Sequence, residues 1–588
     1  MEEELKKVGL SKQPYWSTKY LKNVKELSKP VYKIREERDV HVTVRDGVKL
    51  CMDVFRPDVE GEKFPALVAW STYGKSQQSL RRLPRPYGSL MFDHSIEAGD
   101  IDFWVTRGYV FVIPDPRGIG KSEGEWNGMY SLQEQEDCYD VIEKVAQRPW
   151  CDGNIGMIGF SYFGFIQPIV AALQPPHLKA IMPIHVGDSF YLHAYPGGIL
   201  TDYYFRFLTL NQPNNPVSEA EKSYTAEELK FKINERLEDP FIRSNSNFVK
   251  TLETWPPRFN TWFLDLLLHP LDGPFWKVRS EQTIRDKIKI PVCGVIELMD
   301  GVGSTPYISG VFKMFADPKL NVPKKVFVAG RRLKCPYRFS SEEMLRWYDH
   351  WFKGIDTGIM DEPPIKIFVM GVNRYRYEKE WPLSRTRWTK LYLQRYKKLD
   401  TEPERDEDIP PDILVHEPPT ISLATDTPSC RYATEPLTRP IEVTGPVALN
   451  LYAAIDVEDA NFIAKLWDVS PNGERPISSG TLRASHRTLV EERSKPWLPV
   501  HDHTNSVPVK PGQVEEYAIE MTVTSNVFQL GHRIELEIKT MDPSPDSTSV
   551  GPIPSPWVTI YRIYRDAKYQ SHLMLPVIPE TPPELWID

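Results

Sequence analysis

Residues 154–164, NIGMIGFSYFG, decide the fold that the sequence predicts. Ile155, Met157 and Ile158 form a short apolar run typical of a buried strand, and the next residues match Gly-x-Ser-x-x-Gly, a slightly stretched nucleophile elbow. Such a turn pushes its serine out of the backbone, and the glycines relieve the crowding. We therefore predict that Ser161 lies between a strand and a helix, where unpaired N–H groups can face an oxyanion. An ordinary turn with a serine N-cap would also explain this segment taken alone.

Length and composition indicate a multi-domain globular protein. The chain has 588 residues, of which 41% are hydrophobic and 26% charged, and we expect two or three domains. A net charge of -8 without a basic run argues against nucleic acid as a partner. The first residues, MEEELKKVGL, lack the apolar core of a signal peptide, and no stretch is long enough to span a bilayer. We expect a cytoplasmic protein that does not bind membranes.

The residue pattern predicts neither a metal nor a cofactor. The six cysteines are scattered without a Cys-x-x-Cys pair, so we expect buried free thiols rather than disulfides or a zinc site. The glycine-rich loop 115–124, DPRGIGKSEG, does not have the spacing of a phosphate-binding loop, which argues against nucleotide binding. His501 and His503 resemble metal ligands, but no third ligand accompanies them.

The order of the elements predicts an α/β domain interrupted by an insertion. Strands are expected at 65–70, 109–113, 180–184, 290–296, 325–329 and 365–370, with helices at 132–147 and 344–352 and a hairpin around Asp46-Gly47. This alternation predicts a mainly parallel sheet. Residues 189–289 are aromatic-rich and helical, and we expect them to form a cap over the active-site edge. Beyond about residue 389, short alternating strands predict a β-sandwich of the jelly-roll type.

Several motifs together resemble those of the family of serine hydrolases that contains cocaine esterase and Xaa-Pro dipeptidyl-peptidase. They are Arg45-Asp-Gly-Val, Asp115-Pro-Arg-Gly with Ser122-Glu-Gly, Pro149-Trp-Cys-Asp-Gly-Asn-Ile-Gly, Pro175-Pro-His-Leu-Lys-Ala, Trp347-Tyr-Asp-His-Trp-Phe-Lys-Gly and Ala484-Ser-His-Arg. The resemblance covers the chain from about residue 35 to its end. It implies an N-terminal extension (1–35), an α/β-hydrolase domain (36–188 and 290–388), a helical cap (189–289) and a jelly-roll domain (389–588).

The same resemblance implies roles for four residues. Ser161 corresponds to the nucleophile, the backbone N–H of Tyr162 to one oxyanion donor, the hydroxyl of Tyr73 to the second donor, and Asp300 to the triad aspartate. A packed aromatic at a strand end is the alternative for Tyr73, and a turn aspartate is the alternative for Asp300.

The sequence departs from the family at the triad histidine. Lys334 occupies the histidine position, and Arg331 and Arg332 stand where proline and tryptophan are expected. A lysine needs its pKa lowered by roughly three units to act as a base near neutral pH, and a nearby Asp300 would raise that pKa instead. We therefore expect a Lys334–Asp300 ion pair rather than a Ser161–Lys334 dyad. A lysine that points to solvent, or a different alignment of this loop with the family, is also left open. Arg331 and Arg332 could hold a carboxylate if they face the pocket.

A different histidine could also reach the pocket through space. His94, His185 and His193 lie in segments that could border it, although each could equally be a surface or satisfied histidine. His350 belongs to the helix motif and is expected to be structural.

Three functions remain open from the sequence. The first is an enzyme that acts on an ester, amide or related carbonyl group of a small molecule through Ser161 and an oxyanion hole. The second is a non-hydrolytic cyclase, lyase or isomerase that uses the same pocket without an acyl-enzyme, because Lys334 replaces the histidine. The third is an inactive binding homologue. A small-molecule substrate is the expected partner, and a homodimer is left open.

Overall fold

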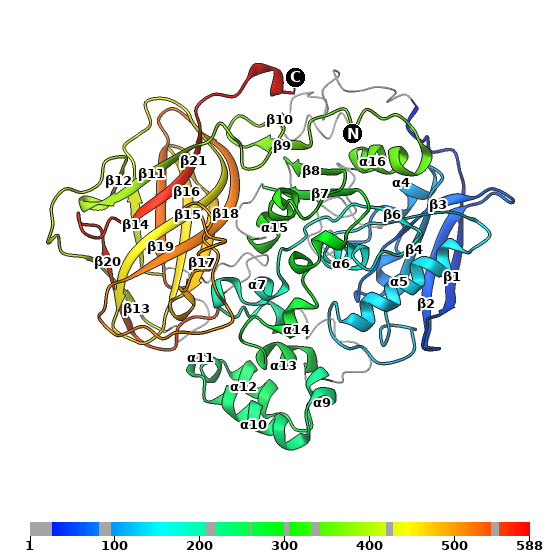
Figure 1. Cartoon of the computed structure of the whole chain (residues 1–588), viewed down its shortest axis with the longest axis horizontal. Coiled ribbons are helices and arrows are strands. Elements are labelled where there is room, and N and C mark those ends of the chain that lie inside the picture. The colour runs from blue at the N-terminus through cyan, green and yellow to red at the C-terminus, as the bar shows by residue number, and fades with distance from the viewer. Residues whose placement is uncertain are drawn as a thin grey trace.

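A computed structural model describes residues 26–81, 96–205, 218–258, 260–298, 305–330, 341–418, 427–542 and 552–587. Two large sheets organise these residues, and each has its own hydrophobic core. Figure 1 shows the C-terminal sheet on the left and the N-terminal α/β sheet on the right, with helices α7 (Phe190–Ala194) and α15 (Thr305–Ala316) between them.

The first sheet has ten strands and is mainly parallel, as predicted. Its order is β1-β2-β4-β3-β5-β6-β7-β8-β9-β10, and neighbours from β4 through β9 pair in parallel. The strands are β1 (Ile34–Thr43), β2 (Lys49–Pro57), β3 (Phe64–Val68), β4 (Val110–Asp115), β5 (Cys151–Met157), β6 (Leu178–Ile181), β7 (Val292–Glu297), β8 (Lys324–Ala329), β9 (Ile365–Val369) and β10 (Arg374–Glu378). β1 and β2 form the expected hairpin, with Thr43 opposite Lys49.

Helices cover both faces of this sheet because its strands are apolar on both sides. One hydrophobic cluster contains residues of α5 (Leu132–Ala146), α6 (Tyr162–Ala171) and α15, and a second contains residues of α4 (Ile101–Val105) and α16 (Ser341–Lys353). The short helix α2 (Lys75–Gln78) follows β3. The α/β layers therefore place the β5–α6 turn at one edge of a buried sheet.

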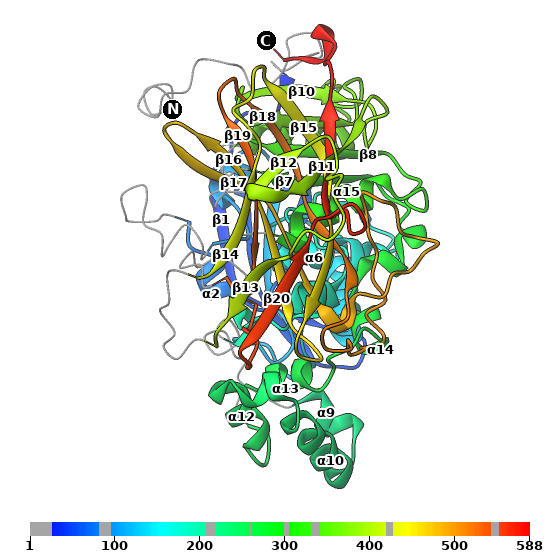
Figure 2. The ribbon, with the colours of Figure 1, turned by 90° about the vertical axis from the view of Figure 1, so that its left-hand side faces the viewer.

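Short helices between β6 and β7 form the inserted segment. After α7 they are η3 (Pro196–Gly198), α9 (Glu219–Ser223), α10 (Ala226–Leu237), α11 (Pro240–Arg243), α12 (Ser246–Glu253), α13 (Thr261–Leu267), α14 (Pro274–Lys277), η4 (Glu281–Thr283) and η5 (Arg285–Lys287). Figures 1 and 2 show α9, α10, α12 and α13 projecting from one end of the molecule. A capping box of Thr225 and Glu228 begins α10, which satisfies the N–H groups of its first turn.

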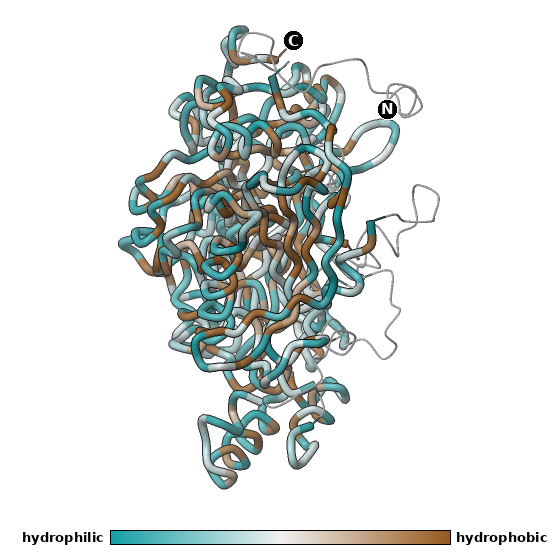
Figure 3. The backbone as a smooth tube through the Cα atoms, turned by 90° about the vertical axis from the view of Figure 1, so that its right-hand side faces the viewer, coloured by the Kyte–Doolittle hydropathy of each residue, from teal (hydrophilic) through white to brown (hydrophobic). Residues whose placement is uncertain are grey.

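The C-terminal domain is a curled, mainly antiparallel β-structure, which agrees with the predicted sandwich. Its strands are β11 (Arg387–Gln394), β12 (Lys398–Asp400), β13 (Asp412–His416), β14 (Ser429–Ala433), β15 (Ile441–Ile455), β16 (Asn461–Ser470), β17 (Gly473–Arg483), β18 (Glu515–Phe528), β19 (Arg533–Lys539), β20 (Thr559–Tyr564) and β21 (His572–Ile578). The sheet closes where β21 also pairs with β15. Figure 3 looks at the molecule from the side of the α/β domain and shows hydrophobic segments gathered near the centre of that view.

Two further expectations can be compared with the described residues. Cys51, Cys138, Cys151, Cys293 and Cys430 are buried free thiols, and Cys335 lies outside the described residues. Of the helices that the structure describes, none combines the length and apolar character needed to cross a membrane.

Candidate active site

Ser161 lies on a strained turn between β5 and α6. Its backbone angles are φ 58° and ψ -112°, a left-handed conformation that side chains other than glycine rarely adopt. The turn is held from both sides, because the Ser161 N–H donates to the Ile184 carbonyl at 3.0 Å and the Phe165 N–H donates to the Ser161 carbonyl at 2.8 Å. Helix α6 begins at the next residue, so the serine lies at its N-terminus as the sequence predicts.

Glycines on both sides of Ser161 are required by close contacts. A Cβ atom at Gly159, where φ is 122°, would lie 2.4 Å from the Phe163 Cβ. At Gly164 it would lie 2.1 Å from the Ile184 carbonyl oxygen, because helix α6 packs directly on that segment. The spacing Gly-x-Ser-x-x-Gly thus reflects one glycine for the turn and one for the approach of helix to strand.

Three of the predicted site residues line one small cavity. Ser161, 9% exposed, lies there with Tyr73 and Tyr162. The Tyr73 ring packs edge-on against Tyr162, with 5.7 Å between centroids, and against Phe163 at 5.8 Å. The other described residues of the lining are Met129, Tyr130, Phe165, Phe190, His193, Tyr203 and Tyr204. The wall is therefore mostly aromatic, and the inserted segment supplies part of it.

A buried glutamate holds the side chain of Tyr162. The Tyr162 hydroxyl lies 2.7 and 2.8 Å from the two Glu134 oxygens, the Trp70 Nε1–H donates to Oε1 at 2.9 Å, and the Tyr130 N–H donates to Oε2 at 2.7 Å. Burial raises the pKa of Glu134 to about 7, although these donors act in the opposite sense. Glu134 thus fixes the residue whose N–H is the predicted oxyanion donor.

Sequence reasoning missed Glu134, although its spacing carries a signal. Glu134, Cys138, Val141 and Val145 recur at helical spacing and form one buried stripe of α5. A carboxylate in an apolar stripe must find donors or change its pKa. That position could have been singled out from the sequence.

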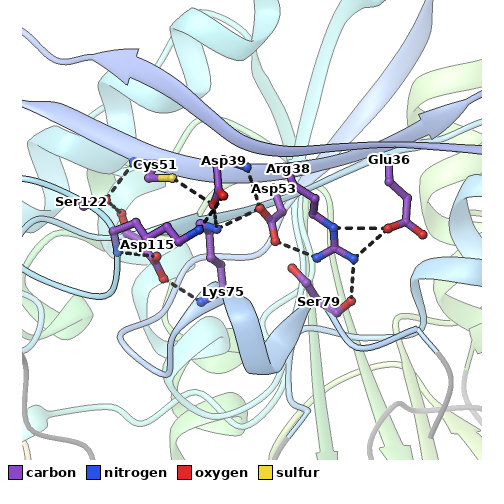
Figure 4. A network of polar contacts seen from close by, with 10 residues as sticks. Glu36, Arg38, Asp39, Cys51, Asp53, Lys75, Ser79, Asp115 and Ser122 are labelled. Carbon is purple, nitrogen blue, oxygen red and sulfur yellow. Dashed lines mark hydrogen bonds and ion pairs between the residues drawn. The ribbon is translucent and has the colours of Figure 1, made fainter.

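A charged network anchors the loop that carries Tyr73 (Figure 4). Lys75, two residues later, is buried, and its Nζ lies 2.6 Å from Asp39 Oδ1 and 2.9 Å from Asp53 Oδ1. Arg38 also contacts Asp53, at 2.8 Å. Strands β1 and β2 therefore hold the Tyr73 loop at the edge of the sheet through paired charges.

The motif Asp115-Pro-Arg-Gly serves the same loop. Asp115 accepts hydrogen bonds from the backbone N–H of Lys75 at 2.6 Å and from that of Lys121 at 3.1 Å. A Cβ at Gly120, where φ is 54°, would lie 2.2 Å from Asp115 Oδ2. The second glycine of this glycine-rich loop is thus needed for its close approach to the Asp115 carboxylate.

Of the three histidines considered, the structure places His193 in the Ser161 cavity. Its Nδ1 is hydrogen-bonded to the Tyr204 hydroxyl, and burial lowers its pKa to about 3. The imidazole is therefore neutral and a weak proton acceptor at pH 7. His185 packs on Phe160, with its Nε2 3.8 Å from Glu297 Oε1, and His94 lies outside the described residues.

The histidines of the C-terminal domain make ordinary protein contacts. The His501 Nε2–H donates to the Ala518 carbonyl at 2.7 Å, and the His503 Nδ1 lies 3.1 Å from the His486 Nδ1. Within the described ranges, no three histidine, cysteine or acidic side chains gather as a metal site would require.

Four predicted site residues, Asp300, Arg331, Arg332 and Lys334, lie outside the described residues. The ion pair expected between Lys334 and Asp300 accordingly stays a prediction. The same holds for the oxyanion roles of Tyr73 and Tyr162, whose positions beside Ser161 are compatible with them.

Comparisons with known proteins cover nearly the whole chain. Residues 46–328 match the family model of X-Pro dipeptidyl-peptidase (S15 family), and residues 357–573 match the X-Pro dipeptidyl-peptidase C-terminal non-catalytic domain. Cocaine esterase of Rhodococcus sp. (strain MB1 Bresler) is 27% identical over 92% of this chain and 98% of its own. A putative serine esterase of Mycobacterium bovis is 25% identical over 93% and 96%.

Solved structures support the same fold. A CocE/NonD family hydrolase from Staphylococcus aureus superposes with a TM-score of 0.73 at 22% identity, covering 95% of this chain and 98% of that one. The two family models, the relatives and this fold agree with the motifs around Ser161. The chain therefore belongs to the hydrolase family of cocaine esterase and the X-Pro dipeptidyl-peptidases, with an S15 domain followed by the C-terminal domain.

Proposed function

We propose that the protein hydrolyses an ester or amide of a small molecule, with Ser161 as nucleophile. The observation that carries this proposal is the left-handed Ser161 at the start of α6, in one cavity with Tyr73 and Tyr162. A strained backbone conformation at a serine costs folding free energy, and such conformations occur mainly at functional sites. The serine oxygen attacks the carbonyl carbon, and a tetrahedral oxyanion forms.

The oxyanion is stabilised by two donors. Tyr162 is the first residue of α6, and N–H groups in the first turn have no partner inside their helix. The helix N-terminus also carries partial positive charge, which favours a developing anion. The Tyr73 hydroxyl supplies the second donor, and removal of one such donor typically slows turnover by about 10²–10³-fold.

The lining of the cavity indicates the kind of chemical group that would lie beside Ser161. Among its described residues none carries a carboxylate, while Tyr130, Phe165 and Phe190 present aromatic rings. An apolar or aromatic acyl group is therefore favoured over a free ammonium group, which would need an acidic partner. We accordingly favour esterase over aminopeptidase action.

A second candidate is a non-hydrolytic step on the same oxyanion hole. Lys334 stands at the position of the triad histidine, and His193 has a pKa too low for efficient base catalysis. An enolate or polarised ketone could be stabilised by the same donors without an acyl-enzyme. We further propose a cytoplasmic location, with a small molecule as partner.

Hydrolysis of 4-nitrophenyl esters by the full chain tests the proposal. We expect 4-nitrophenyl phenylacetate to be turned over and phenylalanine 4-nitroanilide to be a poor substrate. Ser161→Ala should abolish the ester hydrolysis. Ester hydrolysis that persists in Ser161→Ala would contradict the nucleophilic role, and a wild type that hydrolyses no ester would favour the second candidate.

A further inference from the structure

A second cavity, of about 540 Å³, lies between the α/β domain and the C-terminal domain. Helix α7 separates it from the Ser161 cavity, since Phe190 and His193 line the Ser161 cavity whereas Tyr191 and Leu192 line the other. Helix α15 and strands β17 and β18 complete its walls, and Figure 1 shows α7 and α15 between the two sheets. The two cavities have no described lining residue in common.

Stacked aromatic side chains stand in the wall of this interdomain cavity. Trp381 stacks on Phe312 with 4.0 Å between ring centroids, and Trp497 stacks on Trp388 at 4.6 Å. Stacking fixes Trp381, Phe312 and Trp497 in place, so these rings are preorganised for a planar ligand. A volume of this size is typical of pockets that bind small organic molecules.

Most charges in the wall are already paired. Lys313 lies 2.7 Å from Glu520, and Arg285 contacts Asp188 and, at 3.0 Å, Asp317. This set holds two cations and three carboxylates, so it carries a net charge of -1. Each of these charges already contacts an oppositely charged partner, so they add polar surface without leaving a free charge for a ligand.

One cation and one anion in the wall remain without such a partner. Within the described ranges, neither Arg493 nor Asp272 has an oppositely charged side chain within 4.0 Å. Arg493 is exposed and Asp272 is half-buried. Burial raises the pKa of Asp272, while Lys277 and Arg493 act in the opposite sense. A partly buried carboxylate without a partner is stabilised by an ammonium group.

The geometry points to a second binding site, in this interdomain cavity, for an aromatic zwitterion about the size of a dipeptide. Its carboxylate binds the Arg493 guanidinium, its ammonium binds Asp272, and its ring packs against the stacked Trp497 or Trp381. The site is separate from the proposed catalysis at Ser161 and needs no chemical step.

Calorimetric titration of full-length Ser161→Ala protein with the dipeptide Phe-Phe tests this site, since this variant has no Ser161 hydroxyl that the probe could acylate. N-acetyl-Phe-Phe lacks the ammonium group, and Phe-Phe amide lacks the carboxylate. We expect Phe-Phe to bind about tenfold or more tightly than either capped form, because each lost charge-assisted contact is worth that factor.

Each charge variant should weaken binding only of the probes that carry the group which the replaced residue binds. Asp272→Asn should weaken Phe-Phe but leave N-acetyl-Phe-Phe unchanged, and Arg493→Gln should weaken Phe-Phe but leave Phe-Phe amide unchanged. Trp497→Ala should weaken all three, whereas Arg405→Gln, an exposed arginine of the same domain outside the cavity, should weaken none. Equal affinity of the three probes, or no effect of Asp272→Asn and Arg493→Gln, would overturn the proposal. Absence of binding at millimolar Phe-Phe would also overturn the proposal, whether or not Ser161 proves to be a nucleophile.

Discussion

Replacing Glu134 by glutamine should leave a buried donor unpaired beside the active site. In the wild type Oε1 accepts from Trp70 Nε1–H and Oε2 from the Tyr130 N–H, while the Tyr162 hydroxyl contacts both oxygens. Whichever oxygen becomes the amide nitrogen will face an N–H group. One unpaired buried donor costs about 1–3 kcal/mol.

The cost should depend on pH, because Glu134 titrates and glutamine does not. In the folded protein the pKa of Glu134 is raised to about 7, whereas the ordinary pKa of a glutamate is 4.5. A raised carboxyl pKa stabilises the folded state below the unfolded value, and this contribution is lost as the pH rises to about 7. The difference between these two pKa values corresponds to about 3 kcal/mol of folding free energy. The wild-type advantage over Glu134→Gln should therefore shrink between pH 5 and pH 8.

Thermal unfolding midpoints of both proteins at pH 5, 6, 7 and 8 measure this effect. For a domain of roughly 250 residues, 1 kcal/mol shifts the midpoint by about 2 °C, so we expect a deficit of about 2–6 °C at pH 5 that narrows at higher pH. Glu136→Gln is the matched control, since that side chain is 35% exposed and pairs with Arg45 at the surface. A deficit that stays constant or widens as the pH rises would refute the titration of Glu134.

Three further predictions concern the elbow and the Tyr73 loop. Gly164→Ala should lower the free energy of unfolding by about 2–4 kcal/mol, because the new Cβ atom would meet the Ile184 carbonyl. Gly273→Ala is the control and should leave the free energy of unfolding unchanged, since nothing lies within 4 Å of its new Cβ. Equal denaturation midpoints of the two variants would contradict this. Lys75→Met should cost about 1–3 kcal/mol and lower kcat, because it removes the buried one of the two cations that contact the buried Asp53. The exposed Lys121→Met should change the midpoint little, and equal effects of both variants would refute the anchoring role. Tyr73→Phe should keep its ring packing and thermal midpoint yet lower kcat about hundredfold, so an unchanged kcat would remove Tyr73 from the oxyanion hole.

The elbow could be predicted from the sequence because its requirements are local. The strand, the strained Ser161 and the glycines at 159 and 164 lie within a few residues of one another, and Gly159 answers a contact with Phe163 inside that segment. Gly164 answers a contact with Ile184, which follows the next strand. The alternation of strands and helices likewise indicates the parallel sheet. Local pattern and tertiary structure agree in this part of the chain.

The supports of the site could not be predicted in the same way, because they connect distant segments. Lys75 meets Asp39 and Asp53 from two strands far upstream, and no periodicity marks that meeting. His193 enters the Ser161 cavity because α7 of the inserted segment packs over the elbow, which its own sequence does not reveal. Only the assembled fold brings these residues together.

The central claim is that Ser161 is an activated nucleophile, and labelling with a fluorophosphonate tests it most directly. Intact-mass measurement on the wild type and on Ser161→Ala shows whether one adduct forms and where. The account predicts a single adduct on the wild type that is lost in Ser161→Ala. A wild-type protein that stays unlabelled, or a variant labelled equally well, would contradict it.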